Sequence, residues 1–258
     1  MNYPKISIVT PSFNQGQFIE QTILSVLEQN YPNLEYIIID GGSTDNSVEI
    51  IRKYEKRLTY WVSEKDKGQS DALNKGLAKC TGEVFNWLNS DDYLEPNALF
   101  CIGKRFQQTN CDVLAGRMRV IKEGEEISIW GPTVFYENLA QNLGMSLNVQ
   151  PCTFFNLEKL KRLGDISEQL HYTMDQELWY KFLLTYPDIK FIHVGEILAN
   201  FRLHEQSKSV SMAQHFRKDL LSIFHQLASI SGAAKYQKHL ERYFGNEIDR
   251  NYTWNLPS

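Results

Sequence analysis

Two adjacent aspartates, Asp91 and Asp92, are the residues of this sequence best suited to chemistry. They follow the run Glu83–Leu88, which predicts a buried strand, so two carboxylates stand at a strand end. Carboxylate oxygens are the ligands that hard divalent cations prefer. The pair also fits a structural role, in which Asp92 caps a helix that Pro96 opens and Asp91 is solvated in a turn. The residues alone therefore offer a metal site or a capped turn.

Further polar side chains follow two other predicted strands. Thr10 and Ser12 end the first apolar run, and Asp40 ends the second, directly before two glycines. Ligands of open parallel sheets bind beyond the carboxyl ends of the strands, where these side chains would meet. Asp40 could equally fold back onto its own backbone in a turn that leads into the next helix. We therefore expect one crevice at the strand ends, with Asp40 either in the site or in the turn.

The elements that must position these residues follow from hydrophobic periodicity. Short apolar runs alternate with helix-period segments through the first half, which is typical of parallel strands joined by crossover helices. Strands are predicted at Ile6–Thr10, Glu35–Asp40, Tyr60–Ser63 and Glu83–Leu88, with helices at about residues 18–31, 43–54 and 70–79 and another from Pro96. After about residue 111, the alternating segments Val113–Val120 and Glu126–Trp130 predict a small antiparallel or mixed extension.

The C-terminal part is predicted to add helices around the last strands. Helices are expected at Leu157–Gly164 and Asp175–Tyr186, the last strands within residues 191–207, and a tail of two helical segments from Met212 onward. We expect one α/β domain, with residues 1–110 and 111–210 as its halves and residues 211–258 as a helical tail. The tail has apolar residues at helical spacing but no acidic cluster, so it should pack, dimerise or meet a second substrate.

Composition and the absence of two motifs exclude several classes of function. The 258 residues are 42% apolar, which suffices for a large core, and 27 basic and 31 acidic residues are interspersed to a net charge of −4. Nucleic-acid binding depends on a basic surface that this balance does not provide, so DNA and RNA are excluded as partners. No GxGxxG follows the first strand and no GxxxxGK[ST] occurs, which argues against dinucleotide dehydrogenases and P-loop enzymes. Four cysteines without ligand spacing indicate free thiols, and without a long apolar segment we expect a cytoplasmic protein.

Three ordered blocks are specific enough to suggest a family. Residues 7–47 begin SIVTPSFNQG, residues 66–94 contain DKGQSDALN and FNWLNSDDYL, and residues 174–182 read MDQELWYKF. In this order and at these separations they resemble the family-2 glycosyltransferases, which are inverting enzymes of GT-A fold. The similarity spans about residues 4–210. It implies a Rossmann-like, mostly parallel sheet that binds a nucleotide-sugar donor.

The resemblance also implies a role for the residues at the strand ends. The end of the first strand and the turn after it border the nucleotide in this family, and the aspartate that closes the second strand contacts the base. Lys67 and Asp71 could reach the phosphates and the nucleotide, although both would also fit the charged start of a helix. The residues implied in nucleotide-sugar binding are Thr10, Pro11, Ser12, Asp40, Lys67, Asp71 and Asp91.

The metal and the catalytic base are implied in the same way. Asp91 and Asp92 match the acidic motif that holds the metal, here Mn²⁺ or Mg²⁺, and the ribose, with Asn89 where an aspartate often stands. His204 matches a histidine near the metal or diphosphate, although a hydrogen-bonded surface or core histidine is the alternative. Asp175 matches the general base, with Met174 in place of the first member of an acidic pair, and a plain helix cap is the alternative.

These implications lead to one expected function and two alternatives. We expect an inverting transferase that moves a sugar from a UDP-sugar, or else a GDP- or dTDP-sugar, to a hydroxyl of a glycan or lipid-linked acceptor in surface polysaccharide or glycolipid biosynthesis. A sugar-nucleotide pyrophosphorylase is the first alternative, but TPSFNQGQ lacks the basic loop that it would need. A catalytically silent nucleotide-sugar-binding subunit is the second, because Asn89 and Met174 replace acids. Peripheral membrane attachment and a homodimer stay open.

Overall fold

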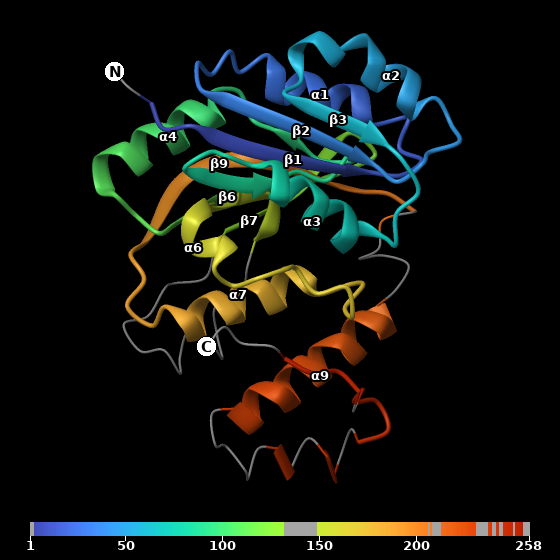
Figure 1. Cartoon of the computed structure of the whole chain (residues 1–258), viewed down its shortest axis with the longest axis vertical. Helices are drawn as coiled ribbons and strands as arrows, with labels where there is room; N and C mark the ends of the chain where they lie inside the picture. The colour runs from blue at the N-terminus through green and yellow to red at the C-terminus, as the bar shows by residue number, and fades with distance from the viewer. Residues whose placement is uncertain are drawn as a thin grey trace.

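Four apolar runs of the N-terminal half form neighbouring parallel strands, as the sequence predicts (Figure 1). The computed structural model describes residues 3–131, 149–205, 207, 213–230, 237–238, 241–242, 245–249 and 251–254. Every residue of the central strand β1 is buried, because helices cover both faces of the sheet. The strands lie in the order β3 (Tyr60–Ser63), β2 (Leu34–Asp40), β1 (Ile6–Ser12) and β4 (Val84–Trp87).

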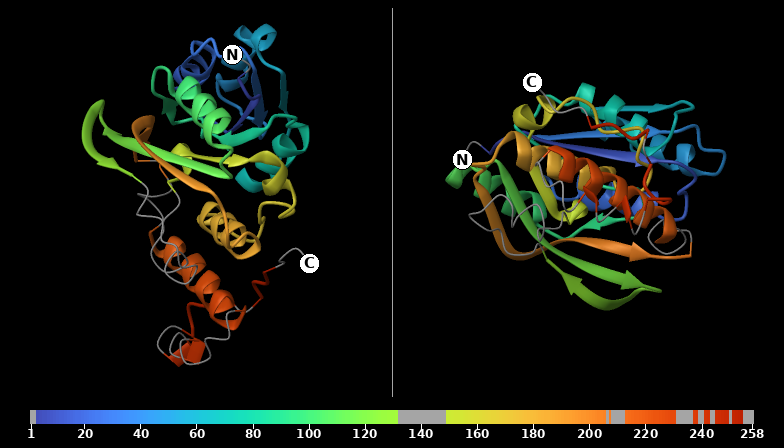
Figure 2. Two further views of the ribbon diagram at one scale, coloured as in Figure 1. Left: turned by 90° about the vertical axis from the view of Figure 1, so that its left-hand side faces the viewer. Right: turned by 90° about the horizontal axis from the view of Figure 1, so that it is seen from below.

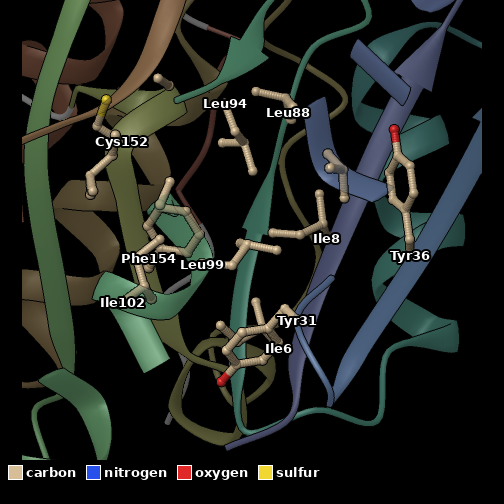
Figure 3. Close-up of a cluster of buried hydrophobic side chains, with 14 of the residues drawn as sticks. Ile6, Ile8, Tyr31, Tyr36, Leu88, Leu94, Leu99, Ile102, Cys152 and Phe154 are labelled. Atoms are coloured by element: carbon tan, nitrogen blue, oxygen red, sulfur yellow. The ribbon is translucent and has the colours of Figure 1, made fainter. Parts of the chain in front are cut away.

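The crossover helices divide between the two faces. Apolar side chains of α1 (Ile19–Leu27), α2 (Ser47–Lys53) and α4 (Ala98–Thr109) join one buried cluster, and those of α3 (Gln69–Lys79) join the other. The strands supply both clusters because their side chains alternate. Figure 3 shows part of the first cluster, in which Ile6 and Ile8 of β1, Tyr36 of β2, Leu99 and Ile102 of α4, and Phe154 come together.

Close packing of α3 on the sheet depends on one glycine. A Cβ atom added to Gly76 would lie 2.5 Å from Cγ1 of Val9 on β1, well inside van der Waals contact. Glycine lowers helix propensity by about 1 kcal/mol relative to alanine, so its place in mid-helix has a packing reason. The close approach keeps α3 against β1 and β2.

The second half continues the same sheet as a mixed extension. β8 (Thr153–Asn156) lies antiparallel between β4 and β6 (Val113–Lys122), and β9 (Phe191–Leu203) runs parallel to β6. β5 (Tyr93–Leu94) pairs with β9, and β7 (Glu125–Trp130) pairs with β6. The expected α/β class with a small mixed extension is confirmed. The sequence reading missed β5 and β8, and it expected several last strands where the structure has the single strand β9.

The remaining helices lie below the sheet in Figure 1. They are α6 (Leu157–Lys161), α7 (Met174–Thr185) and α9 (Ala213–Ile230), and two 3₁₀ turns, η1 (Glu55–Arg57) and η2 (Gln150–Cys152), complete the elements. The predicted helices at 157–164 and 175–186 and the first tail helix are therefore confirmed. The second predicted tail segment falls largely outside the described residues, and the domain limits at 110 and 210 stay predictions. In the described part of the chain, no helix is both long and apolar enough to cross a bilayer.

Candidate functional site

The topology brings the ends of six strands to one edge of the sheet. β1, β2, β3 and β4 are parallel, and Asp40 at the end of β2 stands opposite both Ser12 and Ser63. β6 has the direction of β4 because β8 lies antiparallel between them, and β9 is parallel to β6. His204, directly after β9, therefore lies at the same edge as Asp91, which follows β4.

Asp91 and His204 form a pair at this edge. Nε2 of His204 lies 3.1 Å from Oδ2 of Asp91, although the residues are 113 positions apart. Both side chains keep a path to solvent, with 22% of Asp91 and 16% of His204 exposed. The ring of Phe18 packs against the imidazole, with centroids 4.6 Å apart. Two residues that the sequence named separately for a metal are thus neighbours.

Asp92 has a different environment. Its side chain has no exposed surface, and Oδ1 accepts the backbone N–H of Arg202 at 3.1 Å. Burial, together with the charge of Asp91, raises the pKa of Asp92 well above its usual range. We expected Asp92 to share the metal with Asp91. In the structure only Asp91 of this pair has exposed carboxylate surface, and Asp92 joins the turn to β9.

Asn89 organises the same turn as a neutral donor and acceptor. Its carbonyl oxygen accepts Nε2 of Gln69 at 2.8 Å, and its amide group donates to Gln150 at 3.3 Å and to Oδ2 of Asp92 at 3.4 Å. An aspartate here would set a third carboxylate beside Asp91 and Asp92 and could not donate. The departure from the commoner motif therefore suits the buried position of Asp92.

Arg202 supports this turn, and the sequence reading did not name it. Its Nη1 donates to the backbone oxygen of Asp91 at 2.6 Å, and its guanidinium group also donates to Gln21. The guanidinium lies between the rings of Tyr93 and Phe18, 4.6 Å and 5.2 Å from their centroids. The available signal was its position, because Arg202 lies near the end of β9 and only two residues before His204.

The carboxylate of Asp40 forms hydrogen bonds within the turn that follows β2 and with the end of β3. It accepts the N–H groups of Gly42 at 3.1 Å and Ser43 at 2.9 Å, together with the hydroxyls of Ser43 at 2.5 Å and Ser63 at 2.7 Å. The side chain is fully buried. The turn that the sequence left as an alternative is therefore present. The expected contact of Asp40 with a nucleotide stays a prediction.

The end of β1 presents one aromatic ring to solvent. The Thr10 hydroxyl points into the core, where it is 3.1 Å from Oη of Tyr36, and Pro11 is buried. The Ser12 hydroxyl is buried without a hydrogen-bond partner among the described residues. Phe13, which the sequence reading passed over, is 59% exposed. An exposed aromatic ring at a strand end is a stacking surface for a planar ligand.

Asp66 is a second residue that the sequence reading missed. Its Oδ1 accepts the N–H of Gly68 at 2.9 Å, and a Cβ atom on Gly41 would lie 2.6 Å from its Oδ2. Burial, with smaller effects from Asp71 and Asp40, raises the pKa of Asp66. The glycine after Asp40 thus lets a second carboxylate approach the same strand end.

Asp71 lies in the first turn of α3, and Lys67 directly precedes Gly68, the N-cap of this helix. Asp71 accepts the N–H of Lys67 at 3.0 Å, and this hydrogen bond is the main cause of its lowered pKa. Nζ of Lys75 lies 3.3 Å from Asp71. The side chain of Lys67 is 76% exposed, with Nζ 3.4 Å from Glu168. The contacts of Asp71 match the structural alternative, whereas Lys67 remains accessible to a ligand.

Asp175 lies in the first turn of α7 and is half-buried. The N-cap of α7 is Thr173, so Asp175 does not occupy the cap position. α7 precedes β9 by a short connection, and its N-terminal end therefore lies at the edge where β9 ends, as Figure 1 shows. The helix start thus carries a carboxylate to the side of the sheet that holds Asp91 and His204.

A metal at this edge would need ligands beyond those that the described part of the chain supplies. No cluster of three or more His, Cys, Asp or Glu side chains in the described ranges could hold a cation by itself. Asp91 and His204 supply one carboxylate and one imidazole. Such a pair suits a cation that also binds oxygens of its substrate.

Proteins of similar sequence are glycosyltransferases. The family described as Glycosyl transferase family 2 matches residues 7–164. A glycosyltransferase of Rickettsia typhi is 30% identical over 210 residues, which are 78% of this chain and 65% of that protein. Chondroitin synthase of Escherichia coli is 26% identical over 256 residues, 97% of this chain and 36% of that protein. The chain thus spans less than two thirds of the length of these curated relatives.

Solved structures agree on the fold. TarS of S. aureus in complex with UDP has a TM-score of 0.65 and 19% identity, over 86% of this chain and 64% of that one. The mannosyltransferase PcManGT of Pyrobaculum calidifontis, in complex with GDP-Man and Mn²⁺, has a TM-score of 0.66 and 18% identity, over 94% and 70%. The expected GT-A fold is confirmed. Since the family match covers more than half of its residues, the chain belongs to glycosyltransferase family 2.

Proposed function

We propose that the chain is an inverting, metal-dependent glycosyltransferase that uses a nucleoside-diphosphate sugar, with a UDP-sugar as the first choice. Its acceptor would be a hydroxyl of a glycan or lipid-linked molecule in surface polysaccharide or glycolipid biosynthesis. The Asp91–His204 pair at the strand ends is the observation that carries this proposal. TarS has been solved with UDP and UDP-GlcNAc and PcManGT with GDP-Man and Mn²⁺, which supports a nucleotide-sugar donor here.

The side chains present fit Mn²⁺ better than Mg²⁺. Mg²⁺ prefers oxygen ligands in octahedral geometry, whereas Mn²⁺ accepts an imidazole nitrogen beside a carboxylate. Asp91 and His204 would hold the ion, and Arg202 would keep the backbone of Asp91 in place. An ion held there would supply positive charge to neutralise the diphosphate and stabilise it as a leaving group.

The other candidates would bind donor and acceptor. Phe13 would stack on the base, and the Ser12 hydroxyl and Asp66 are polar groups near the same strand ends. Asp175 would accept the proton of the acceptor hydroxyl as that oxygen attacks the anomeric carbon. A displacement at that carbon by the acceptor inverts its configuration, because the leaving diphosphate departs from the opposite face.

A ligand panel tests the proposal. Thermal unfolding would be followed with UDP-GlcNAc, UDP-glucose, GDP-mannose and a dTDP-sugar, each with Mn²⁺ and with EDTA. One nucleotide class should raise the Tm with Mn²⁺, since a ligand that binds only the folded state stabilises it by mass action. Release of the corresponding nucleoside diphosphate should need the same metal. Equal stabilisation in EDTA would refute the metal dependence, and no stabilisation by any nucleotide sugar would refute the donor class.

A further inference from the structure

Asp175 lies on α7, a helix whose N-cap side chain does not cap it. Thr173 makes no side-chain cap hydrogen bond, and within the described chain its hydroxyl is buried without a partner. Helix starts expose backbone N–H groups that a nearby acceptor normally satisfies. The chain entering α7 receives such an acceptor from α9, which lies beneath α7 in both Figure 1 and the left view of Figure 2.

Asp219 of α9 is that acceptor. Its Oδ2 accepts the backbone N–H of Tyr172 at 3.1 Å. Burial raises the pKa of Asp219, and hydrogen bonds from the N–H groups of Tyr172 and Thr173 oppose the shift. The ring of Tyr172 also packs against His215 and Phe216 of α9, at centroid distances of 5.2 Å and 5.5 Å. The backbone and the side chain just before α7 are therefore both held by α9.

A second contact holds the helix two residues beyond Asp175. Oη of Tyr252 donates to Oε1 of Glu177 at 2.7 Å, and Glu177 is only 1% exposed. Lys181 neutralises Glu177 from the next turn, with its Nζ 3.2 Å from the same oxygen. Nε2 of Gln226 on α9 donates to the backbone oxygen of Tyr252 at 2.9 Å. The segment 251–254 is thus tied both to α9 and to α7.

Asp175 stands between these two contacts in the sequence. Tyr172 is anchored three residues before it and Glu177 two residues after it, and both anchors come from the C-terminal segment. A displacement of α9 would therefore move the turn that carries the carboxylate. A shift of about 1 Å in a catalytic group can lower a rate by roughly 100-fold.

We infer that Asp219 and Tyr252 are positioning residues for Asp175, so that the C-terminal segment sets the rate of sugar transfer without taking part in donor binding. This inference rests on the proposed role of Asp175 as the base. It assigns a task to the tail that its apolar helix pattern alone does not indicate.

The test compares three full-length variants. Asp219→Ala removes the acceptor, Asp219→Asn keeps a carbonyl oxygen that can accept the same N–H groups, and Lys218→Ala changes the exposed neighbour as a control. The substrate is whichever of UDP-GlcNAc, UDP-glucose and GDP-mannose the wild type turns over. Asp219→Ala should lower kcat by about 10- to 100-fold with an unchanged KM for the nucleotide sugar. Asp219→Asn and Lys218→Ala should stay within about twofold of wild type.

A readout independent of activity is hydrogen–deuterium exchange. Amides of residues 173–178 should exchange faster in Asp219→Ala than in wild type or Asp219→Asn, while peptides from β1 and β4 stay unchanged. If Asp219→Ala does not fold, Tyr252→Phe removes a single hydroxyl and should lower kcat in the same direction. Wild-type kcat in both Asp219→Ala and Tyr252→Phe overturns the inference, as does a rise in KM that equals the loss in kcat.

Asp175→Asn separates this inference from the proposed function. If Asp175→Asn turns over at the wild-type rate, the base is elsewhere and both assignments fail. If Asp175→Asn is inactive and Asp219→Ala behaves like wild type, only the positioning role fails. If both variants lose kcat while donor binding and Asp219→Asn remain normal, the positioning role stands.

Discussion

Replacing each aspartate of the turn after β4 separates ligand binding from folding. Asp91 is partly exposed and faces His204, whereas Asp92 is fully buried and accepts the N–H of Arg202. We therefore expect Asp91→Ala to weaken donor binding with little change in stability. Asp92→Ala should instead destabilise the protein, because it leaves a backbone N–H of β9 without an acceptor.

The magnitudes follow from these contacts. A buried N–H that loses its acceptor costs about 1–3 kcal/mol of folding free energy. Asn89 also loses Asp92 as an acceptor, but this adds little to the cost because its amide group still donates to Gln150. In a chain of this size that lowers the Tm by roughly 2–12 °C. With donor at about 100 times its Kd, wild type gains about 2.7 kcal/mol from binding. A roughly 100-fold weaker affinity in Asp91→Ala leaves about 0.4 kcal/mol of that gain.

Scanning fluorimetry with and without donor and Mn²⁺ measures both effects. Asp188→Ala is a matched control, since Asp188 is an exposed aspartate in the connection between α7 and β9, at the opposite edge of the sheet. The control should match wild type in both Tm and ligand shift. The reasoning is refuted if Asp91→Ala keeps the full ligand shift, or if Asp92→Ala loses that shift with an unchanged Tm.

Four further outcomes are expected. Asp175→Asn should lower the rate of sugar transfer by about 10²–10⁴-fold, while the free energy of unfolding changes by less than about 1 kcal/mol. Initial rates near those of wild type would contradict the role of Asp175 as the base. Phe13→Ala should weaken nucleotide binding by about 1–3 kcal/mol in calorimetry while Phe13→Tyr does not, and equal affinities would exclude stacking. Gly76→Ala should cost about 1–3 kcal/mol in urea unfolding, because the added methyl group meets Val9, and an unchanged midpoint would show that α3 can shift. Glu35→Gln should lower the free energy of unfolding by about 3 kcal/mol near pH 7, and the difference from wild type should shrink as the pH falls from about 4.5 toward 2. A difference that does not change with pH would contradict the lowered pKa of Glu35 as its cause.

The sign of the Glu35 prediction follows from its environment. Burial alone would raise the pKa of Glu35, but hydrogen bonds from Ser7, Lys5 and Thr81 outweigh it and lower the pKa from 4.5 to about 2. A carboxylate with a lowered pKa stabilises the folded state fully above its unfolded value and loses that contribution as protons bind to it. The native network is therefore a source of stability at neutral pH that acid removes.

Periodicity predicted the elements that are long and buried. β1 and β2 have continuous apolar runs, and α7 and α9 have helical stripes, so each was found from the sequence. β5 has only two residues, which is too short for any period to be read, and the four residues of β8 run directly into α6 without a turn that would mark a strand end. Their pairing depends on where β9 and β6 lie, and that is decided by tertiary packing.

The same limit applies to the candidate site. Residue type and strand-end position sufficed to choose Asp91 and His204, which the structure brings together. They did not distinguish Asp91 from Asp92. The two aspartates differ in burial, and a sequence does not show which of two adjacent aspartates in a turn is buried. Nor could they reveal Asp219, whose contact with the start of α7 joins residues 47 positions apart. Roles for all these residues remain predictions.

The distance in sequence between Asp91 and His204 has a consequence for biosynthesis. A ribosome that adds about 5–20 residues per second needs roughly 6–23 s to make the 113 residues that separate them. During that interval β1 to β4 can already pair, yet the imidazole is still missing from the edge of the sheet. A nascent chain therefore cannot use any ligand that needs both side chains to stabilise its first half. That half must persist on its own core until β9 is made. Substitutions that weaken β1 to β4 would therefore reduce the yield of folded protein, even where they leave the function of the finished protein unimpaired.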